Sequence, residues 1–201
     1  MEELNKMSKK TLIDVGSGKH VEFYQNGLEF LDNAKCYRSL MEDLDWQRID
    51  QTPRQEYYSS KKGVPYTYGS GRGVRTYQSQ EWTKLIELLS DVAEDVSGVK
   101  SDVVFLNRYD DSRQHLGWHS DDSTEMDPTK PIVIISFGGQ RYIEFREIGS
   151  EKKTSICLTS GSICVMPAGL QQTHEHRIPK YHDQRVAPRV SLTFRTYREV
   201  Q

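Results

Sequence analysis

The second half of the chain is a succession of short apolar runs separated by turn residues, and this pattern constrains the fold more than any other feature. Six runs have the length and the β-branched and aromatic content of strands: SDVVFLNRYDD, PIVIISFGG, RYIEFREI, TSICLTS, SICVMPAG and RVSLTFRTY. No helical pattern alternates with them, and the sequence has no internal repeat. Strands that follow one another in this way favour a sandwich or a small barrel.

The first half of the chain is of mixed character. Residues 1–20 are polar and are expected to form a flexible leader. One helix is expected after Asp32, and a second in SQEWTKLIELLSDVAEDVSG, which Ser79 would cap and Gly98 would end. Between the two helices, residues 47–78 carry six Lys or Arg residues against two acids, together with five of the eleven tyrosines. This segment is expected to be an irregular, basic loop or hairpin.

Length and composition narrow the class of protein. At 201 residues the chain fits one domain that can bury a proper core. The three cysteines lack a metal-type CxxC spacing, and no apolar run approaches the roughly 18 residues that span a membrane. We therefore expect a soluble, intracellular monomer without a membrane partner, in the cytoplasm or the nucleus. The net charge of −2 means that any attraction to nucleic acid must come from a local patch.

The stretch HLGWHSDDS contains a pattern typical of metal ligands. His119 and Asp121 are two residues apart, so on a strand their side chains would point the same way. The pair alone is a weak signal, because His-x-Asp triplets also arise by chance. A third ligand could come from His174 or His176 in QQTHEHRIPK. Two histidines and one carboxylate would form the facial triad that binds Fe(II) and leaves positions open for other ligands.

The last predicted strand separates polar from apolar side chains. Arg189, Ser191, Thr193 and Arg195 would share one face, and Val190, Leu192 and Phe194 the other. Asn107 and Tyr109 in an earlier run would also share a face. A surface strand shows the same alternation. Two arginines on a polar face equally suit a wet cavity, since a guanidinium can bind a carboxylate, such as that of a 2-oxo acid, through two parallel hydrogen bonds.

Several separate motifs, LNRY, GWHSDD, PIVIISFGG, GSICVMPAG, HRIPK and RVSLTFR, occur in an order and spacing that resemble the catalytic core of the AlkB family. These Fe(II)/2-oxoglutarate oxygenases remove alkyl groups from nucleobases. The resemblance covers residues 101–197, and PYTYGSG with the following helix more loosely. It implies an α+β, mainly β fold: a double-stranded β-helix (jelly-roll) core over 101–197, with N-terminal helices packed on one sheet and a substrate-binding lid. Within a single domain of residues 1–201, an N-terminal extension over 21–100 would carry the lid at about 47–78.

The resemblance also implies roles for individual side chains. Iron would be bound by His119, Asp121 and His176; His176 is preferred to His174 because the family's distal histidine lies a few residues before a proline, as in His-Arg-Ile-Pro here. The residues implied for 2-oxoglutarate are Asn107, Tyr109, Arg189, Ser191, Thr193 and Arg195. Of these, Arg189 would bind the distal carboxylate and Arg195 would steady the carboxylate on the metal side. Candidate substrate contacts are Tyr66, Tyr68, Trp118 and Asp122, with packing as the alternative for Trp118.

Two positions depart from the family pattern. Ser191 stands where many members have Asn, and a serine offers fewer donors. Ser123 stands where repair members often carry an acid that reads the damaged base. Either a neighbour such as Asp122 or Glu125 substitutes for that acid, or the base preference differs.

The implied reaction is oxidative demethylation of N-alkylated nucleobases, of the N1-methyladenine and N3-methylcytosine type, in DNA, with release of formaldehyde, succinate and CO2. This would be direct-reversal repair with Fe(II), 2-oxoglutarate and O2, and with alkylated DNA or RNA as the partner. The alternative is the same chemistry on RNA, a free modified nucleotide or a protein side chain. The basic 47–78 segment would meet phosphates and stack bases, or else be an ordinary solvent-facing hairpin. A binding module without turnover and a zinc hydrolase both leave Arg189 and Arg195 unexplained.

Overall fold

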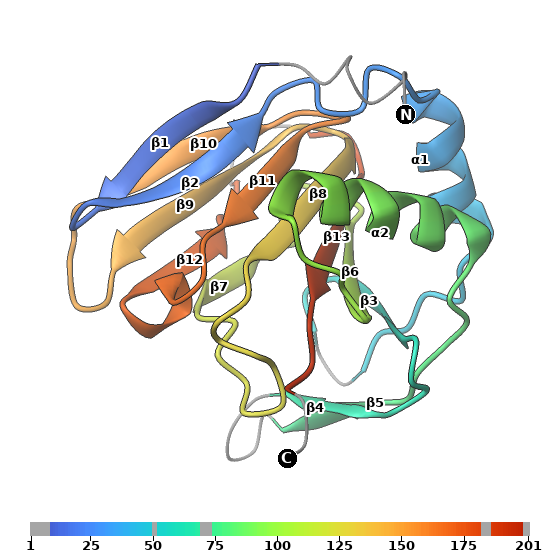
Figure 1. The fold of residues 1–201 in the computed structure, drawn as a ribbon. Coiled ribbons are helices and arrows are strands. Elements are labelled where there is room, and N and C mark those ends of the chain that lie inside the picture. The colour runs from blue at the N-terminus through green and yellow to red at the C-terminus, as the bar shows by residue number, and fades with distance from the viewer. Residues whose placement is uncertain (1–8, 50–51, 69–73, 182–185, 199–201) are drawn as a thin grey trace.

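The computed structural model describes residues 9–49, 52–68, 74–181 and 186–198, and Figure 1 shows their arrangement. In chain order the elements are β1 (Thr11–Gly16), β2 (Lys19–Tyr24), α1 (Asn33–Glu42), β3 (Gln55–Ser60), β4 (Tyr66–Tyr68), β5 (Arg75–Tyr77), α2 (Lys84–Ser97), β6 (Val103–Tyr109), β7 (Leu116–His119), β8 (Ile132–Gly138), β9 (Arg141–Glu147), β10 (Thr154–Leu158), β11 (Ile163–Met166), the 3-10 helix η3 (Leu170–Gln172), β12 (His174–Ile178) and β13 (Arg189–Arg195). The six predicted strands are β6, β8, β9, β10, β11 and β13, so this part of the prediction is confirmed. Neither described helix has the length and apolarity that a membrane crossing requires.

Two antiparallel sheets form the body of the molecule (Figure 1). The larger has the strand order β1-β2-β11-β8-β13-β6-β3, and the smaller has the order β10-β9-β12-β7. Apolar side chains from both sheets, including Phe23 and Ile134 of the larger and Phe145 and Leu158 of the smaller, pack together in one core. Strands that are far apart in sequence lie side by side in both sheets, as the predicted jelly roll requires.

The strand β13 lies inside the larger sheet, between β8 and β6, and divides two environments. Val190, Leu192 and Phe194 are buried in a second core, to which α1 and α2 contribute Leu40 and Leu89. The helices therefore cover one face of the larger sheet, as predicted. The opposite face of β13, which carries Arg189 and Arg195, faces the space between the two sheets.

The helix ends follow the predicted chemistry with one exception. The Asp32 side chain accepts a hydrogen bond from the Lys35 backbone at the start of α1, and Gly98 ends α2 with a φ of 70° that suits glycine. The start of α2 differs from the prediction, because Thr83 rather than Ser79 caps it. Ser79 instead exchanges hydrogen bonds with the backbone of Ser60, since the chain runs beside β3 before the helix begins.

Two predicted boundaries are wrong. The expected flexible leader over 1–20 contains β1, which forms a hairpin with β2 at the edge of the larger sheet; Ile13 and Val15 reach the core between the sheets. The expected lid over 47–78 contains β3, which pairs with β6 along its whole length. Among the described strands of that segment, only the β4–β5 hairpin stands apart from the two sheets (Figure 1). Residues 1–8, 50–51 and 69–73 of these predicted segments lie outside the described residues.

Candidate active site

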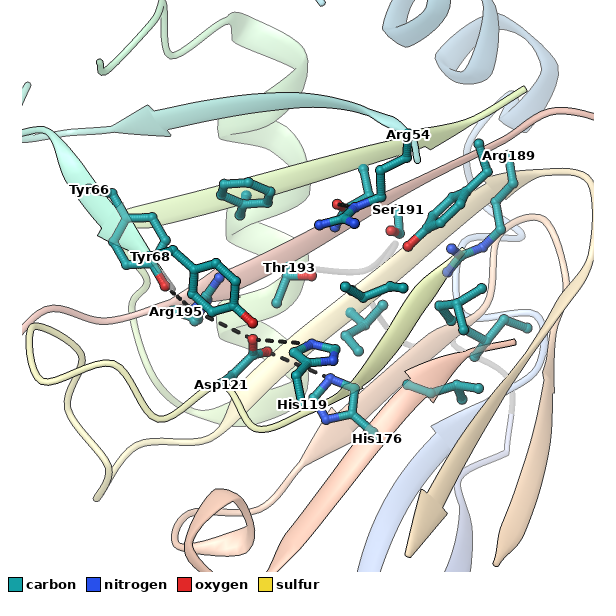
Figure 2. A pocket seen from close by; sticks show the side chains of 18 residues that line it. Arg54, Tyr66, Tyr68, His119, Asp121, His176, Arg189, Ser191, Thr193 and Arg195 are labelled. Carbon is teal, nitrogen blue, oxygen red and sulfur yellow. Dashed lines mark hydrogen bonds and ion pairs between the residues drawn. The ribbon is translucent and has the colours of Figure 1, made fainter. Parts of the chain in front are cut away.

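A cavity lies between the polar face of β13 and the smaller sheet. It is lined by every residue that was predicted to bind the metal or 2-oxoglutarate, and by Tyr66 and Tyr68. Figure 2 shows that these side chains come from several elements and point into one space. The cavity therefore joins the candidate metal ligands with the candidate co-substrate residues.

Three side chains at one end of this cavity form a candidate metal site. One ligand atom each from His119, Asp121 and His176 lies within 4.8 Å of the other two, and Figure 2 shows the three side chains converging. His119 and His176 are direct cross-strand partners on β7 and β12. Asp121 lies two residues beyond the end of β7, in a loop rather than on the strand, and its backbone N–H donates to the Gln171 side chain at 2.9 Å.

An irregular pairing of β7 with β12 decides which residues of β7 face the cavity. His119 pairs with His176 and Leu116 pairs with Ile178, so three steps along β7 correspond to two along β12. Leu116 and His119 consequently both line the cavity. Trp118, next to His119 on the strand, points away from the cavity by ordinary alternation, and the extra residue turns Leu116 to the cavity side.

The two remaining predicted substrate contacts are not brought into this cavity. Trp118 lies on the outer face of the smaller sheet, where its ring is stacked by the guanidinium groups of Arg146 and Arg177, 4.1 and 4.5 Å from the ring centre. Packing, the alternative reading for Trp118, fits this position. Asp122 and Ser123 line a neighbouring cavity instead. The lining residues that the two cavities share are Asp121 and Arg195.

The electrostatics of the triad suit a cation. Burial and the neighbouring charges hold the pKa of His176 at about 3, so this imidazole is neutral and can donate a lone pair. Burial alone would raise the pKa of Asp121, but the charge of Arg195 and the two histidines lower it to about 2. The Nδ1 atom of His119 lies 2.9 Å from the Gly117 carbonyl, which leaves Nε2 for the cavity. A cation would thus meet one carboxylate and two free imidazole nitrogens.

Acid should destabilise the metal-free protein through His176. The pKa of this histidine is about 3 in the folded chain and 6.5 ordinarily, so the unfolded chain takes up the proton first. We expect its full contribution to the free energy of unfolding above pH 6.5 and a progressive loss as the pH falls towards 3. Urea denaturation between pH 7 and 4 would measure this slope, which His176→Leu should flatten. His115→Gln serves as a control that keeps it, and an unchanged slope in the His176 variant would contradict the assignment.

The other end of the cavity holds an arginine that has no anionic partner in the part of the chain that the structure describes. Arg189 is 1% exposed, and its Nη2 donates to the Ser136 hydroxyl at 3.0 Å. Its Nε and Nη1 make no hydrogen bond within the described residues. Burial lowers the pKa of Arg189 to about 10, although the neighbouring Tyr109 favours its charged form. A buried cation with two unsatisfied donors destabilises the folded protein, and binding of a carboxylate ligand would offset that loss of free energy.

Strand register brings the remaining co-substrate residues beside Arg189. Along β13, Arg189 pairs with Tyr109 and Ser191 pairs with Asn107 of β6. Cross-strand partners project to the same face, so all four reach the cavity together. A dicarboxylate lying between Arg189 and the triad would pass these polar groups.

Arg195 lies at the metal end of the same strand. Its Nη1 is 3.7 Å from an Asp121 carboxylate oxygen and donates to the Tyr66 hydroxyl at 3.2 Å. The predicted division between the two arginines therefore agrees with their positions, because Arg189 and Arg195 lie at opposite ends of the cavity (Figure 2). Tyr66 is buried in an aromatic cluster with Tyr58 and Phe105, whereas burial against the cavity raises the pKa of Tyr68 to about 12.

Sequence reasoning missed one pair of charged residues in the cavity wall. Arg54, directly before β3, lines the cavity and forms an ion pair of 2.6 Å with the fully buried Glu56. The only signal in the sequence is the charged pair in PRQEYYSS, within a run that otherwise fits a strand. Nothing local to that run indicates that both charges point inwards.

The comparisons with known proteins agree with this geometry. Residues 20–195 match the model of a family described as the 2OG-Fe(II) oxygenase superfamily. DNA oxidative demethylase ALKBH2 of Homo sapiens is 31% identical over 151 residues, which are 71% of this chain and 56% of that protein. Alpha-ketoglutarate-dependent dioxygenase alkB homolog 3 of Bos taurus is 27% identical over 176 residues, 80% of this chain and 60% of that protein. The chain thus spans between 56% and 61% of the first three curated relatives that it matches.

A solved structure extends the agreement to the fold. The structure of OsALKBH1 covers 94% of this chain, and this chain covers all of it, with a TM-score of 0.66 at 15% identity. At that identity the likeness concerns the fold alone. The chain belongs to the 2OG-Fe(II) oxygenase superfamily, and within it to the AlkB family, whose chemistry uses Fe(II), 2-oxoglutarate and O2.

Proposed function

We propose that this chain is an Fe(II)/2-oxoglutarate-dependent dioxygenase that removes methyl groups from nucleobase nitrogens in DNA, of the N1-methyladenine and N3-methylcytosine type. The products would be the repaired base, formaldehyde, succinate and CO2. One observation carries the proposal: the His119, Asp121 and His176 cluster shares a cavity with Arg189, a buried cation that meets no anion among the described residues. The names of the relatives, DNA oxidative demethylase among them, support DNA as the substrate.

The residues of the triad fit the metal that the family implies. Two imidazoles and one carboxylate are the donor set of non-haem Fe(II) oxygenases, and His119, His176 and Asp121 supply it here. Fe(II) bound there, with 2-oxoglutarate and O2, would supply the oxidising power that hydroxylates the alkyl carbon. A hydrogen bond of 2.9 Å to the Gln171 side chain holds Asp121 in place, and one of 2.9 Å to the Gly117 carbonyl holds His119.

The chain's own residues would orient 2-oxoglutarate between the two arginines. Arg189 would bind the distal carboxylate through Nε and Nη1, which make no hydrogen bond within the described residues. Arg195, beside Asp121, would face the end of the co-substrate nearest the metal. Asn107 and Ser191 would donate to it from the cavity wall.

The β4–β5 hairpin supplies the substrate side of the cavity. Tyr68 lines the cavity close to Asp121, and its ring offers a flat surface for a base. A nucleobase inside a duplex hides its methylated nitrogen, so it must be flipped out or come from a single strand. Next to the hairpin, Lys61 forms an ion pair of 3.0 Å with Glu87, and Lys62 forms one of 2.9 Å with Asp102. Ion pairs at the surface contribute little to stability, so a phosphate of the substrate could replace either acid.

The proposal includes a single chain that works in the interior of the cell. Every group invoked above comes from one chain. The three free cysteines, none in a disulfide, and the mean hydropathy of −0.72 fit a reducing aqueous compartment.

Formaldehyde release tests the proposed function. The iron-loaded protein would be incubated with 2-oxoglutarate and oligonucleotides that carry N1-methyladenine or N3-methylcytosine, as single- and double-stranded DNA and as RNA. We expect formaldehyde and succinate in equal amounts with methylated DNA, and neither product with Asp121→Ala. Equal or faster turnover of RNA would replace DNA as the substrate. Decarboxylation of 2-oxoglutarate that none of the oligonucleotides stimulates would reject nucleic acid.

A further inference from the structure

We infer that Arg54 is a positioning residue for the co-substrate: it fixes the carboxamide of Asn107 so that the NH2 group, and not the carbonyl oxygen, faces the bound anion. The inference rests on the proposed function, because the anion is taken to be 2-oxoglutarate. Arg54 itself does not contact the anion in this account. It acts through a residue of the cavity wall.

The contact between the two residues is short and buried. The Arg54 Nε atom donates to the Asn107 Oδ1 atom at 2.5 Å, and both residues are 6% exposed. A guanidinium N–H has no lone pair to offer, so only the oxygen of the amide can be its partner. The contact therefore assigns the two ends of the Asn107 side chain: Oδ1 towards Arg54 and Nδ2 towards the remaining space.

Arg54 is neutralised from the other side, which distinguishes it from Arg189. Its Nη2 forms the 2.6 Å ion pair with Glu56, and the Tyr77 hydroxyl donates to the second Glu56 oxygen at 2.7 Å. The Glu56 side chain has no exposed surface. Arg54 thus has its anion already, whereas Arg189 has two donors that meet no partner in the described ranges. Arg54 is therefore suited to hold the Asn107 side chain, and Arg189 is suited to bind an anionic ligand.

Strand register keeps this unit in line with the co-substrate residues. Glu56 of β3 pairs with Asn107 of β6, Asn107 pairs with Ser191 of β13, and Ser191 pairs with Ser136 of β8. The four side chains form one polar row across the larger sheet, with Asn107 and Ser191 lining the cavity. Arg54 is among the side chains that line the cavity (Figure 2).

The orientation of the amide matters because its two ends act oppositely on a carboxylate. The Nδ2 group donates a hydrogen bond to a carboxylate oxygen, whereas Oδ1 in the same place would repel it. An amide without a fixed partner can present either end. By holding Oδ1, Arg54 removes the unfavourable state before the co-substrate arrives, which is preorganisation of the site.

A double-mutant cycle on co-substrate affinity tests the inference. Arg54→Met with Glu56→Gln removes the ion pair without leaving a single buried charge. Binding of 2-oxoglutarate to the Mn(II)-loaded protein would be measured by calorimetry, which needs no turnover, and thermal unfolding would confirm that each variant is folded. We expect about tenfold weaker binding in this variant and in Asn107→Ala, the scale of one hydrogen bond to a charged group. Combining the changes should weaken binding no further than Asn107→Ala alone, because Arg54 acts only through Asn107.

Two further variants sharpen the test. Asn107→Asp keeps an oxygen for Arg54 but places a second oxygen towards the cavity, so its affinity should be lower than that of Asn107→Ala. Arg108→Gln is the matched control: this arginine neighbours Asn107 on β6 but points away to bind Asp110 and the Met41 carbonyl, and the dissociation constant should stay within about twofold.

The outcomes separate this inference from the proposed function. If the wild-type protein binds 2-oxoglutarate and the Arg54→Met, Glu56→Gln variant binds it equally well, only the role of Arg54 is rejected. The role of Arg54 would also be rejected if the losses of affinity for 2-oxoglutarate add fully in the combined variant. Full additivity would mean that Arg54 acts independently of Asn107. If the wild-type protein does not bind 2-oxoglutarate, the proposed function and this inference fall together.

Discussion

Replacing His176 with Ala is expected to remove both the metal and the turnover. His176 contributes one of three ligand atoms that lie within 4.8 Å of each other, and Asp121 with His119 alone leaves the site a donor short. Metal content, measured after dialysis against Fe(II) or Mn(II), should fall from about one ion per chain to nearly none. Formaldehyde release should fall by more than about a hundredfold, because even supporting groups around a metal carry effects of that order.

The neighbouring histidine provides the matched control for this experiment. His174 lies on the same face of β12, is 1% exposed, and approaches the Thr173 hydroxyl through Nδ1 at 2.8 Å. It is not part of the cluster of candidate ligands. His174→Gln should retain the metal and most of the turnover. The reverse pattern, with metal lost in the His174 variant and kept in the His176 variant, would show that the wrong histidine has been placed at the metal.

Replacing Arg189 with Met is expected to weaken 2-oxoglutarate binding by a hundredfold or more. The guanidinium is buried and has two donors without partners among the described residues, and a paired contact with a carboxylate would use both. Each hydrogen bond to a charged group contributes about 1.5 to 3 kcal/mol, and about 2.7 kcal/mol corresponds to a hundredfold change in affinity. Calorimetric titration of the Mn(II)-loaded protein with 2-oxoglutarate measures this loss directly.

The same substitution should have the opposite effect on the ligand-free protein. Arg189 has no counter-ion among the residues that the structure describes, and a buried guanidinium in that state costs free energy, so Arg189→Met should unfold at a higher temperature than the wild type when no ligand is present. Added 2-oxoglutarate should then stabilise the wild type but not the variant. Arg146→Met, which changes an arginine on the outer face of the smaller sheet, should leave the affinity unaltered. Unchanged affinity in Arg189→Met would mean that another group anchors the distal carboxylate.

Several features followed from local patterns in the sequence. The apolar runs became β6, β8, β9, β10, β11 and β13, because strand residues must alternate between two environments whatever their partners are. The same alternation placed Arg189 and Arg195 on one face and Val190, Leu192 and Phe194 on the other, and the structure agrees. Asp32 and Gly98 were predicted as helix ends because capping involves only residues within a turn of each other.

Other features depended on pairings between distant segments. The cross-strand pairing of His119 with His176 brings the triad together, and the irregular step in β7 turns Leu116 towards the cavity; neither is visible in LGWH or HEHRI by themselves. The contact of Arg54 with Asn107 joins residues 53 positions apart. The sequence by itself therefore determined the kinds of strand, their polar faces and the family of the chain, since these are local or motif-based properties. Only the tertiary structure decided which side chains meet in the cavity, because strand register is set by non-local hydrogen bonds and by packing between the sheets.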